Sequence, residues 1–160
     1  IVLANLVNFI LTIIVMLFLL FVFRVQFGVR MFALPLVVLL QVFLTSGVVL
    51  IVSGLQVRFR DVKYIVEVLL LLWFYLTPIF YSISLVANIS NNFLRLYLLN
   101  PVTQLVTLYR FLLLPGYIDQ IPSSVSFFNL IATCTVFCFG VFYLGLLVFR
   151  KFAPSFADYV

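Results

Sequence analysis

Long apolar runs separated by short polar connections dominate the chain. Four runs are long enough to cross a bilayer as helices, since a spanning helix needs about 20 mostly apolar residues. They lie at about 2–23, 31–55, 62–86 and 127–149. The connections at 24–30 and 56–61 are short, so consecutive runs should pack as antiparallel hairpins. The pattern therefore predicts an all-α fold, a polytopic membrane helix bundle that occupies residues 1–160 as one transmembrane domain.

Proline and asparagine residues divide the second half of the chain. Pro78 removes a helical hydrogen bond, which predicts a kink or an unwound turn in the third run. NISNN at 88–92 reads as a polar turn. A short apolar helix should then cover 101–114, because Asn100 suits the N-cap and Pro101 the first helical position. At about 1.5 Å per residue this helix is too short to cross the hydrocarbon, so we expect it to be re-entrant or interfacial.

Composition supports a membrane environment. Hydrophobic residues make up 67% of the chain and charged residues only 8%, whereas soluble domains carry about a quarter charged residues. The chain also begins without Met, directly in an apolar run. We therefore expect it to be part of a longer membrane protein whose preceding segment is missing.

The net charge of +5 then indicates topology rather than nucleic-acid binding. Four spans place both chain ends and the VRFRDVK sequence (57–63) on one side of the membrane. That side collects five basic residues: Arg58, Arg60, Lys63, Arg150 and Lys151. The other side has four: Arg24, Arg30, Arg95 and Arg110. The excess and its density at 57–63 favour the first side as cytoplasmic.

The residue types exclude most catalytic chemistry. Without histidine, no serine–histidine or cysteine–histidine pair can form, and Cys134 and Cys138 lack further metal ligands. We expect both cysteines to pack on a helix. No glycine precedes Lys-Ser or Lys-Thr as in a phosphate-binding loop, so any ATP chemistry must come from a partner. The chain is predicted to be a non-catalytic subunit without a metal or cofactor of its own.

Polar residues within the runs allow two interpretations. Asn5, Asn8 and Thr12 share a helix face, and Gly47 and Gly54 lie two turns apart. Such groups form packing seams between membrane helices, or they contact a transported molecule.

A similar choice applies to charged and aromatic residues of the third run. Glu67 is either an intramembrane proton carrier or a partner for Lys63, one turn away. Helical spacing also aligns Trp73, Thr77, Phe80 and Ser84, with Tyr81 at the margin of the stripe. Rings with hydroxyls suit a carbohydrate path, and equally an aromatic belt at the membrane interface.

Two linked stretches resemble a known family. SGLQVRFRDVKYIVEVLLLLWFYLTPIFY and LYLLNPVTQLVTLYRFLL are similar to membrane subunits of type-2 ABC exporters, in the branch that handles O-antigen, capsule and teichoic acid. The resemblance implies a six-span subunit of the bacterial inner membrane, to which this chain contributes the third to the sixth span. It implies a pair of such subunits, two cytoplasmic ATPase subunits that carry ATP and Mg²⁺, and a lipid-linked glycan as substrate.

The resemblance also suggests roles for particular residues. The loop at 56–63 would be cytoplasmic and face an ATPase through Arg58, Arg60, Asp61 and Lys63. The path candidates are Trp73, Thr77, Phe80, Tyr81 and Ser84. The short helix would form part of an outer gate with Asn100, Pro101, Tyr109 and Arg110.

Three other functions stay open at this point. A type-2 ABC permease for a drug or a lipid would share the same motifs. A secondary transporter would use Glu67 as its coupling group, and a membrane scaffold would transport nothing.

Overall fold

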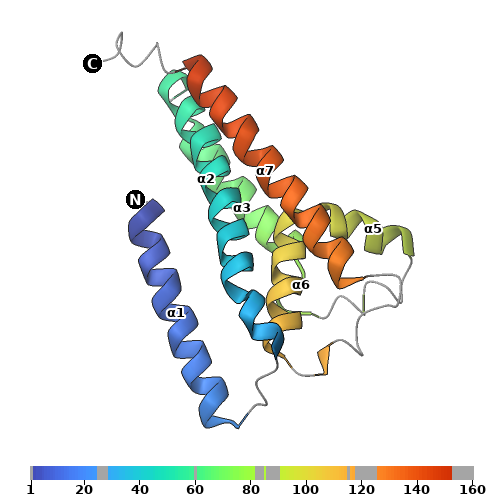
Figure 1. Ribbon diagram of the computed structural model, residues 1–160. Helices are drawn as coiled ribbons and strands as arrows, with labels where there is room; N and C mark the ends of the chain where they lie inside the picture. The colour runs from blue at the N-terminus through green and yellow to red at the C-terminus, as the bar shows by residue number, and fades with distance from the viewer. Residues whose placement is uncertain are drawn as a thin grey trace.

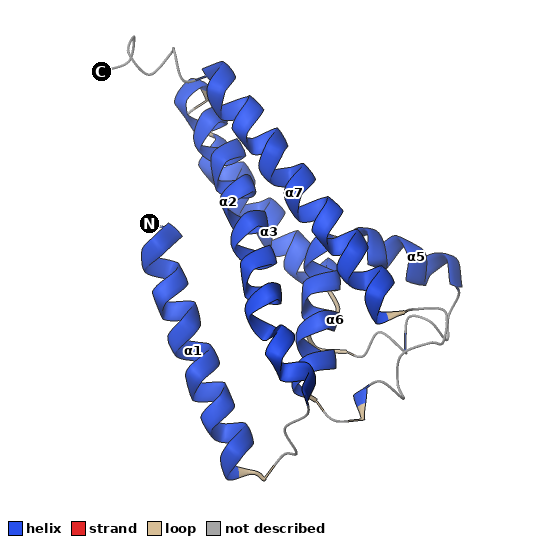
Figure 2. Cartoon of the chain, viewed as in Figure 1, coloured by secondary structure: helices blue, strands red, loops and turns tan. Residues whose placement is uncertain are grey.

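The computed structural model describes residues 2–24, 29–59, 61–81, 85, 91–114, 116–117 and 126–152. Within these ranges the chain is helical and contains no strand (Figure 2). The elements in chain order are α1 (Val2–Val22), the 3-10 helix η1 (Val29–Ala33), α2 (Leu34–Arg58), α3 (Val62–Leu76), α5 (Asn91–Leu99), α6 (Pro101–Leu113) and α7 (Phe127–Phe152). Figure 1 shows them as an elongated bundle, which confirms the predicted all-α membrane architecture.

Three helices of the described part are long and apolar enough to cross a membrane: Asn5–Val22, Arg30–Gln56 and Phe127–Phe152. Within the third predicted span at 62–86, helix α3 ends at Leu76; Leu85 is helical again, and 82–84 and 86 lie outside the described residues. Thr77 is extended, with φ −95° and ψ 132°, because a residue that precedes proline avoids the helical region. Pro78 therefore interrupts the helix, which confirms the predicted unwound turn at this position.

The two longest helices, α2 and α7, run in the same direction and form the centre of the bundle (Figure 1). They touch backbone to backbone, because a Cβ on Gly47 would lie 2.7 Å from the Phe142 nitrogen. A Cβ on Gly145 would lie 2.5 Å from the Gly47 carbonyl oxygen. Small residues at a crossing allow this approach, so the predicted close approach at Gly47 is confirmed, and its partner is Gly145.

An apolar core lies where α2, α6 and α7 meet. Its buried members include Val37 and Leu40 of α2, Leu108 of α6, and Cys134 and Cys138 of α7. The two sulfur atoms are 3.8 Å apart and form no disulfide. The cysteines thus pack inside the bundle, as the sequence predicted.

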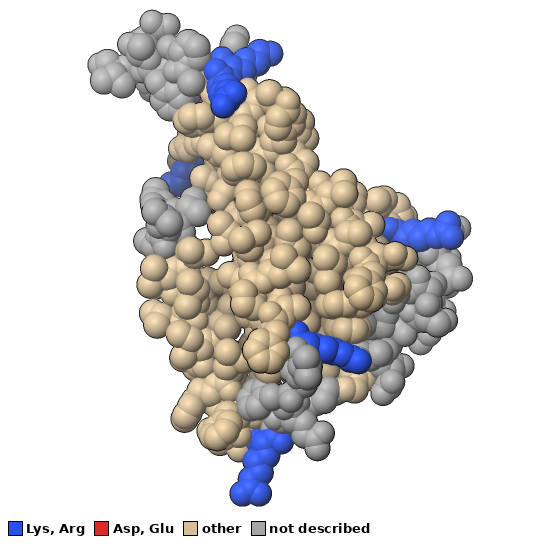
Figure 3. Space-filling view, viewed as in Figure 1, with Lys and Arg blue, Asp and Glu red and all other residues tan. Residues whose placement is uncertain are grey.

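Helix α1 and helix α3 lie at the periphery. None of the spanning residues of α1 is buried within the chain, and α3 has no buried residue. Figure 3 shows a surface that is mostly neither basic nor acidic, from which a few Lys and Arg side chains project. Large hydrophobic side chains such as Phe18 and Leu71 are exposed, and an apolar exterior fits a chain whose surroundings are lipid.

Helix α5 was not predicted. The polar turn assigned to NISNN overlaps its first turn, because α5 begins at Asn91 and continues to Leu99. Its carboxyl end turns at once into α6, where the Asn100 amide donates to the Tyr97 carbonyl over 3.2 Å. The short helix predicted at 101–114 is therefore the second arm of a helical hairpin, packed against α2 and α7.

Candidate functional site

The site is built around the break at the end of α3. Thr77 and Pro78 are both buried, and the Thr77 hydroxyl donates to the Trp73 carbonyl over 2.8 Å. The Ile79 amide donates to the Thr77 carbonyl over 2.7 Å, which turns the backbone after the proline. The TPIFY segment (77–81) begins at this turn and follows the last residue of α3.

Asn100 joins this break to the start of α6. Its side-chain oxygen accepts from the Val102 amide at 3.0 Å, so it caps the helix as predicted. The same oxygen accepts from Trp73 Nε1 at 2.8 Å. Its side-chain nitrogen donates to the Thr77 hydroxyl at 3.2 Å. One amide side chain thus satisfies a helix terminus, an indole and a hydroxyl, none of which the surrounding apolar groups could satisfy.

Arg110 joins the other end of α6 to the same segment. Its Nη1 atom donates to the Tyr81 carbonyl at 2.9 Å, and its Nη2 atom donates to the Ile79 carbonyl. Both carbonyls follow the break at Pro78, beyond Leu76, the last residue of α3. A planar guanidinium can reach two acceptors at once, so Arg110 satisfies both carbonyls and finds partners for its own charge.

An aromatic pair extends the junction to α5. The Tyr81 and Tyr97 hydroxyls lie 3.2 Å apart, and their ring centroids are 6.5 Å apart in an edge-on arrangement. Phe80, by contrast, is not buried in this junction, and 82% of its surface is exposed. The junction therefore contacts both arms of the α5–α6 hairpin.

The predicted aromatic stripe is not a single helix face. Trp73 belongs to α3, but Thr77, Phe80 and Tyr81 follow the end of that helix, and Ser84 lies outside the described residues. The spacing argument was wrong here because Pro78 stops the helical period. Trp73 and Thr77 make internal hydrogen bonds instead, and their place on a glycan path stays a prediction.

Two cavities adjoin the junction. One of about 330 Å³ lies between α2, α3 and α6, and Trp73 and Thr77 are part of its wall. The other, of about 380 Å³, lies between α1, α2 and α6. Thr45 and Val102 line both cavities, so the two lie side by side along α2 and α6.

The walls of the larger cavity are mainly apolar with a few polar groups. There the Tyr109 hydroxyl donates to Gln41 Oε1 at 2.8 Å, and Thr12 contributes a further hydroxyl. Tyr109, which was predicted to belong to the gate helix, thus lies beside Gln41 and Thr45 of α2. Sequence reasoning missed both of these polar residues. Gln41 and Thr45 are four residues apart in an apolar run, and that spacing was the available signal.

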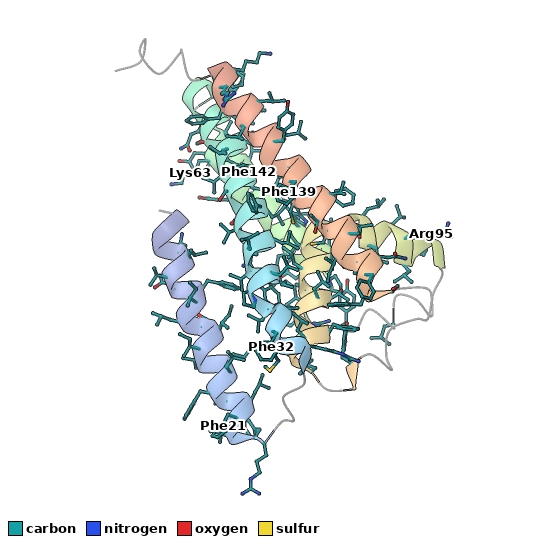
Figure 4. The ribbon with its side chains drawn as sticks, viewed as in Figure 1. Phe21, Phe32, Lys63, Arg95, Phe139 and Phe142 are labelled. Carbon is teal, nitrogen blue, oxygen red and sulfur yellow. The ribbon has the colours of Figure 1, made fainter. Side chains whose placement is uncertain are left out.

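The predicted coupling loop is a tight turn between α2 and α3. The Val62 amide donates to the Phe59 carbonyl over 3.2 Å. Asp61 occupies the N-cap position of α3 without a side-chain cap bond, and Lys63 is exposed (Figure 4). Arg60 and the Arg58 side chain lie outside the described residues.

This turn shares one end of the bundle with the end of α7. Figure 1 places the turn and the end of α7 together, where Arg150 and Lys151 form the last basic residues of that helix. Glu67 is exposed on α3, one turn beyond Lys63. Basic residues therefore gather where the sequence placed the cytoplasmic side, although the orientation itself stays a prediction.

The fold, its apolar exterior and its spanning helices define a polytopic helical membrane protein. A family profile described as "ABC-2 type transporter" matches residues 1–114, and the chain belongs to this family. Family membership makes it a type-2 ABC transporter permease, the class that the sequence resemblance indicated.

Curated relatives agree with this assignment. The O-antigen export system permease protein RfbA of Myxococcus xanthus is 33% identical over 136 residues, which cover 85% of this chain and 51% of that protein. A protein of the same name from Klebsiella pneumoniae is 30% identical over 125 residues, 78% of this chain and 44% of the relative. A second Klebsiella pneumoniae protein of that name is 28% identical over 152 residues, 94% of this chain and 54% of the relative.

The chain thus spans about half the length of the curated relatives that it matches. No solved structure matches it significantly.

Proposed function

We propose that this chain is part of the permease of an ATP-driven exporter, which moves a lipid-linked polysaccharide across the bacterial cytoplasmic membrane. The observation that carries the proposal is the family match together with three relatives that are all named as O-antigen export permeases. The sequence has no phosphate-binding loop. ATP and Mg²⁺ therefore belong to a partner, and the permease acts by changing shape.

The proposed assembly contains two permease copies and two cytoplasmic ATPase subunits. The loop at 56–63 faces the ATPase, with Arg58, Arg60, Asp61 and Lys63 as the contacting residues. A tight turn supports this role, because a force applied to it is passed directly to α2 and α3 instead of being absorbed by a long loop. The basic residues at this end of the bundle fit a cytoplasmic location.

The glycan needs polar partners along the path, whereas its lipid needs apolar walls. We place the path beside the two adjoining cavities, where apolar walls carry the Thr45 hydroxyl and the Tyr109–Gln41 pair. Sparse polar groups in an apolar channel can bind sugar hydroxyls without holding the glycan tightly. Helix α6, with Asn100, Pro101, Tyr109 and Arg110, serves as the outer gate helix.

The proposal is tested in the native bacterium with the full-length gene. Deletion should remove long polysaccharide from the cell surface and leave it inside, and the wild-type gene should restore it. The full-length permease should also co-purify with an ATPase. Unchanged surface polysaccharide in the deletion strain would count against the polysaccharide substrate. Loss of drug resistance instead would support the drug-permease alternative.

A further inference from the structure

Two polar side chains hold the TPIFY segment from opposite ends of α6. Asn100 binds its first residue, Thr77, and Arg110 binds the carbonyls of Ile79 and Tyr81. The two side chains are ten residues apart, about 15 Å along a helix. The segment 77–81 can extend about 13 Å, so it lies along α6 in the same direction and is fastened at both ends.

Fastening at two points has a mechanical consequence. A single hydrogen-bonded contact would let one element pivot about the other. With contacts at both ends of α6, a pivot or a slide must break one of them. Breaking either contact would leave partly buried polar groups without partners, which is unfavourable in a membrane. Helix α6 and the end of α3 should therefore move as one body.

Helices α2 and α7 hold α6 less firmly against displacement. Four hydrogen bonds join it to α3 and the TPIFY segment. Its described side-chain hydrogen bond to α2 is that of Tyr109 with Gln41. Apolar residues such as Leu105 and Leu108 pack in the core that α6 shares with α2 and α7. Apolar surfaces can slide over a short distance without leaving a polar group unsatisfied.

Helix α3 is suited to transmit a movement. It has no buried residue, so a shift of α3 against α2 disturbs little packing within the chain. Its first residue, Val62, follows directly on the turn at 59–61. A displacement of this turn would therefore travel along α3, about 22 Å long, to the junction with α6.

We infer that Asn100 and Arg110 are positioning residues that join α6 to α3 as a single lever, so that movement of the 59–61 turn shifts the outer gate helix. This inference rests on the proposed function, because the ATPase partner supplies the movement. Their proposed role is to hold α6 against α3 and not to bind nucleotide or ATPase. They determine how much of the movement reaches the outer end of the permease.

If Asn100 serves only to hold α6 against α3, a disulfide between positions 77 and 100 should replace the hydrogen bond between Asn100 and Thr77. In the full-length protein, Cys134→Ala and Cys138→Ala first remove the two thiols of this chain, and any cysteine in the rest of the protein is replaced as well. Thr77→Cys and Asn100→Cys then place two thiols where the native side chains are 3.2 Å apart. Export should fall several-fold in the reduced double variant and recover on oxidation. If oxidation blocks export while ATP hydrolysis continues, α6 must separate from α3, and the inference is overturned.

A second pair of variants separates coupling from folding. Arg110→Lys keeps the charge but cannot bind two carbonyls in a fork. It should lower export several-fold at unchanged protein level, while ATP hydrolysis by the purified complex persists. Arg95→Lys, an exposed change on neighbouring α5, should leave the ratio of export to ATP hydrolysis as in wild type. Equal ratios for both variants would overturn the role of Arg110.

Failure of the proposed function would look different. If no ATPase co-purifies with the wild-type full-length protein, the exporter assignment fails whatever the variants do. Disulfide formation between positions 77 and 100 in native membranes needs no transport. Rapid formation supports the junction, and its absence overturns it.

Discussion

Replacing Gly145 by alanine places a methyl group 2.5 Å from the Gly47 carbonyl oxygen and 3.1 Å from its Cα atom. An ordinary contact between such atoms needs about 3.5 Å, so α2 and α7 must separate by about 1 Å at their crossing. Both sides of this contact are backbone, so no side chain can rotate away. Overpacking of this kind costs about 1–3 kcal/mol.

Gly140 offers a matched control on the same helix. A Cβ there meets no atom within 4 Å. Gly140→Ala and Gly145→Ala share the gain of about 1 kcal/mol from helix propensity. The difference between them therefore isolates the steric cost at the crossing, and we expect it to be about 1–3 kcal/mol. Gly54→Ala, where the nearest atoms lie at 3.4 Å, should fall between the two.

Thermal unfolding of the purified protein in detergent, followed by circular dichroism, measures this difference. For a chain of this size, about 1 kcal/mol corresponds to about 2–4 °C in the midpoint. Gly145→Ala should therefore unfold several degrees below Gly140→Ala, and Gly47→Ala should behave like Gly145→Ala. Equal midpoints for Gly145→Ala and Gly140→Ala would refute the backbone contact between α2 and α7.

Three further predictions concern the junction, the core and the loop. Asn100→Ala should destabilise α6 by about 1 kcal/mol through loss of its cap. It should also shift the fluorescence of Trp73, the single tryptophan of this chain. An unshifted spectrum would contradict the hydrogen bond between Trp73 and Asn100. Cys134 and Cys138, both fully buried, should resist maleimide in native membranes and react after denaturation, whereas rapid native labelling would contradict the described core. Arg60→Ala in the full-length protein should assemble with its ATPase but export poorly; normal export with normal stimulation of the ATPase would count against a coupling role for the loop.

Sequence patterns predicted the features that depend on neighbouring residues. Apolar runs indicated α1, α2 and α7, since each must satisfy its backbone within one helix. Asn100 and Pro101 located the start of α6, and Pro78 located the break after α3. In each case the signal and its effect lie within a few positions of one another along the chain.

Features that depend on residues far apart in the sequence were missed or were predicted only in part. Gly47 was recognised as a point of close approach, but nothing in its neighbourhood identified Gly145 as the partner. Arg110 was assigned to the gate helix without its two carbonyl acceptors, since Tyr81 and Ile79 lie 29 and 31 residues earlier in the sequence. Phe80 is not on the predicted helix face either, because α3 ends at Leu76.

Helix α5 shows a different limit. Its asparagine-rich start resembles a turn, because Asn91 and Asn92 favour caps and loops. The helix forms because it packs as a hairpin with α6, where Gln104 Nε2 donates to the Leu98 carbonyl. A tertiary contact thus overrides the local preference.

Transport by the purified complex tests the central claim most directly. The full-length permease and its ATPase are reconstituted into vesicles with a lipid-linked glycan on the outer face, and the glycan that reaches the lumen is measured. The account predicts transfer that requires ATP hydrolysis, persists without a proton gradient and survives Glu67→Gln. Transfer that continues without ATP and disappears in Glu67→Gln would contradict it and identify a secondary transporter.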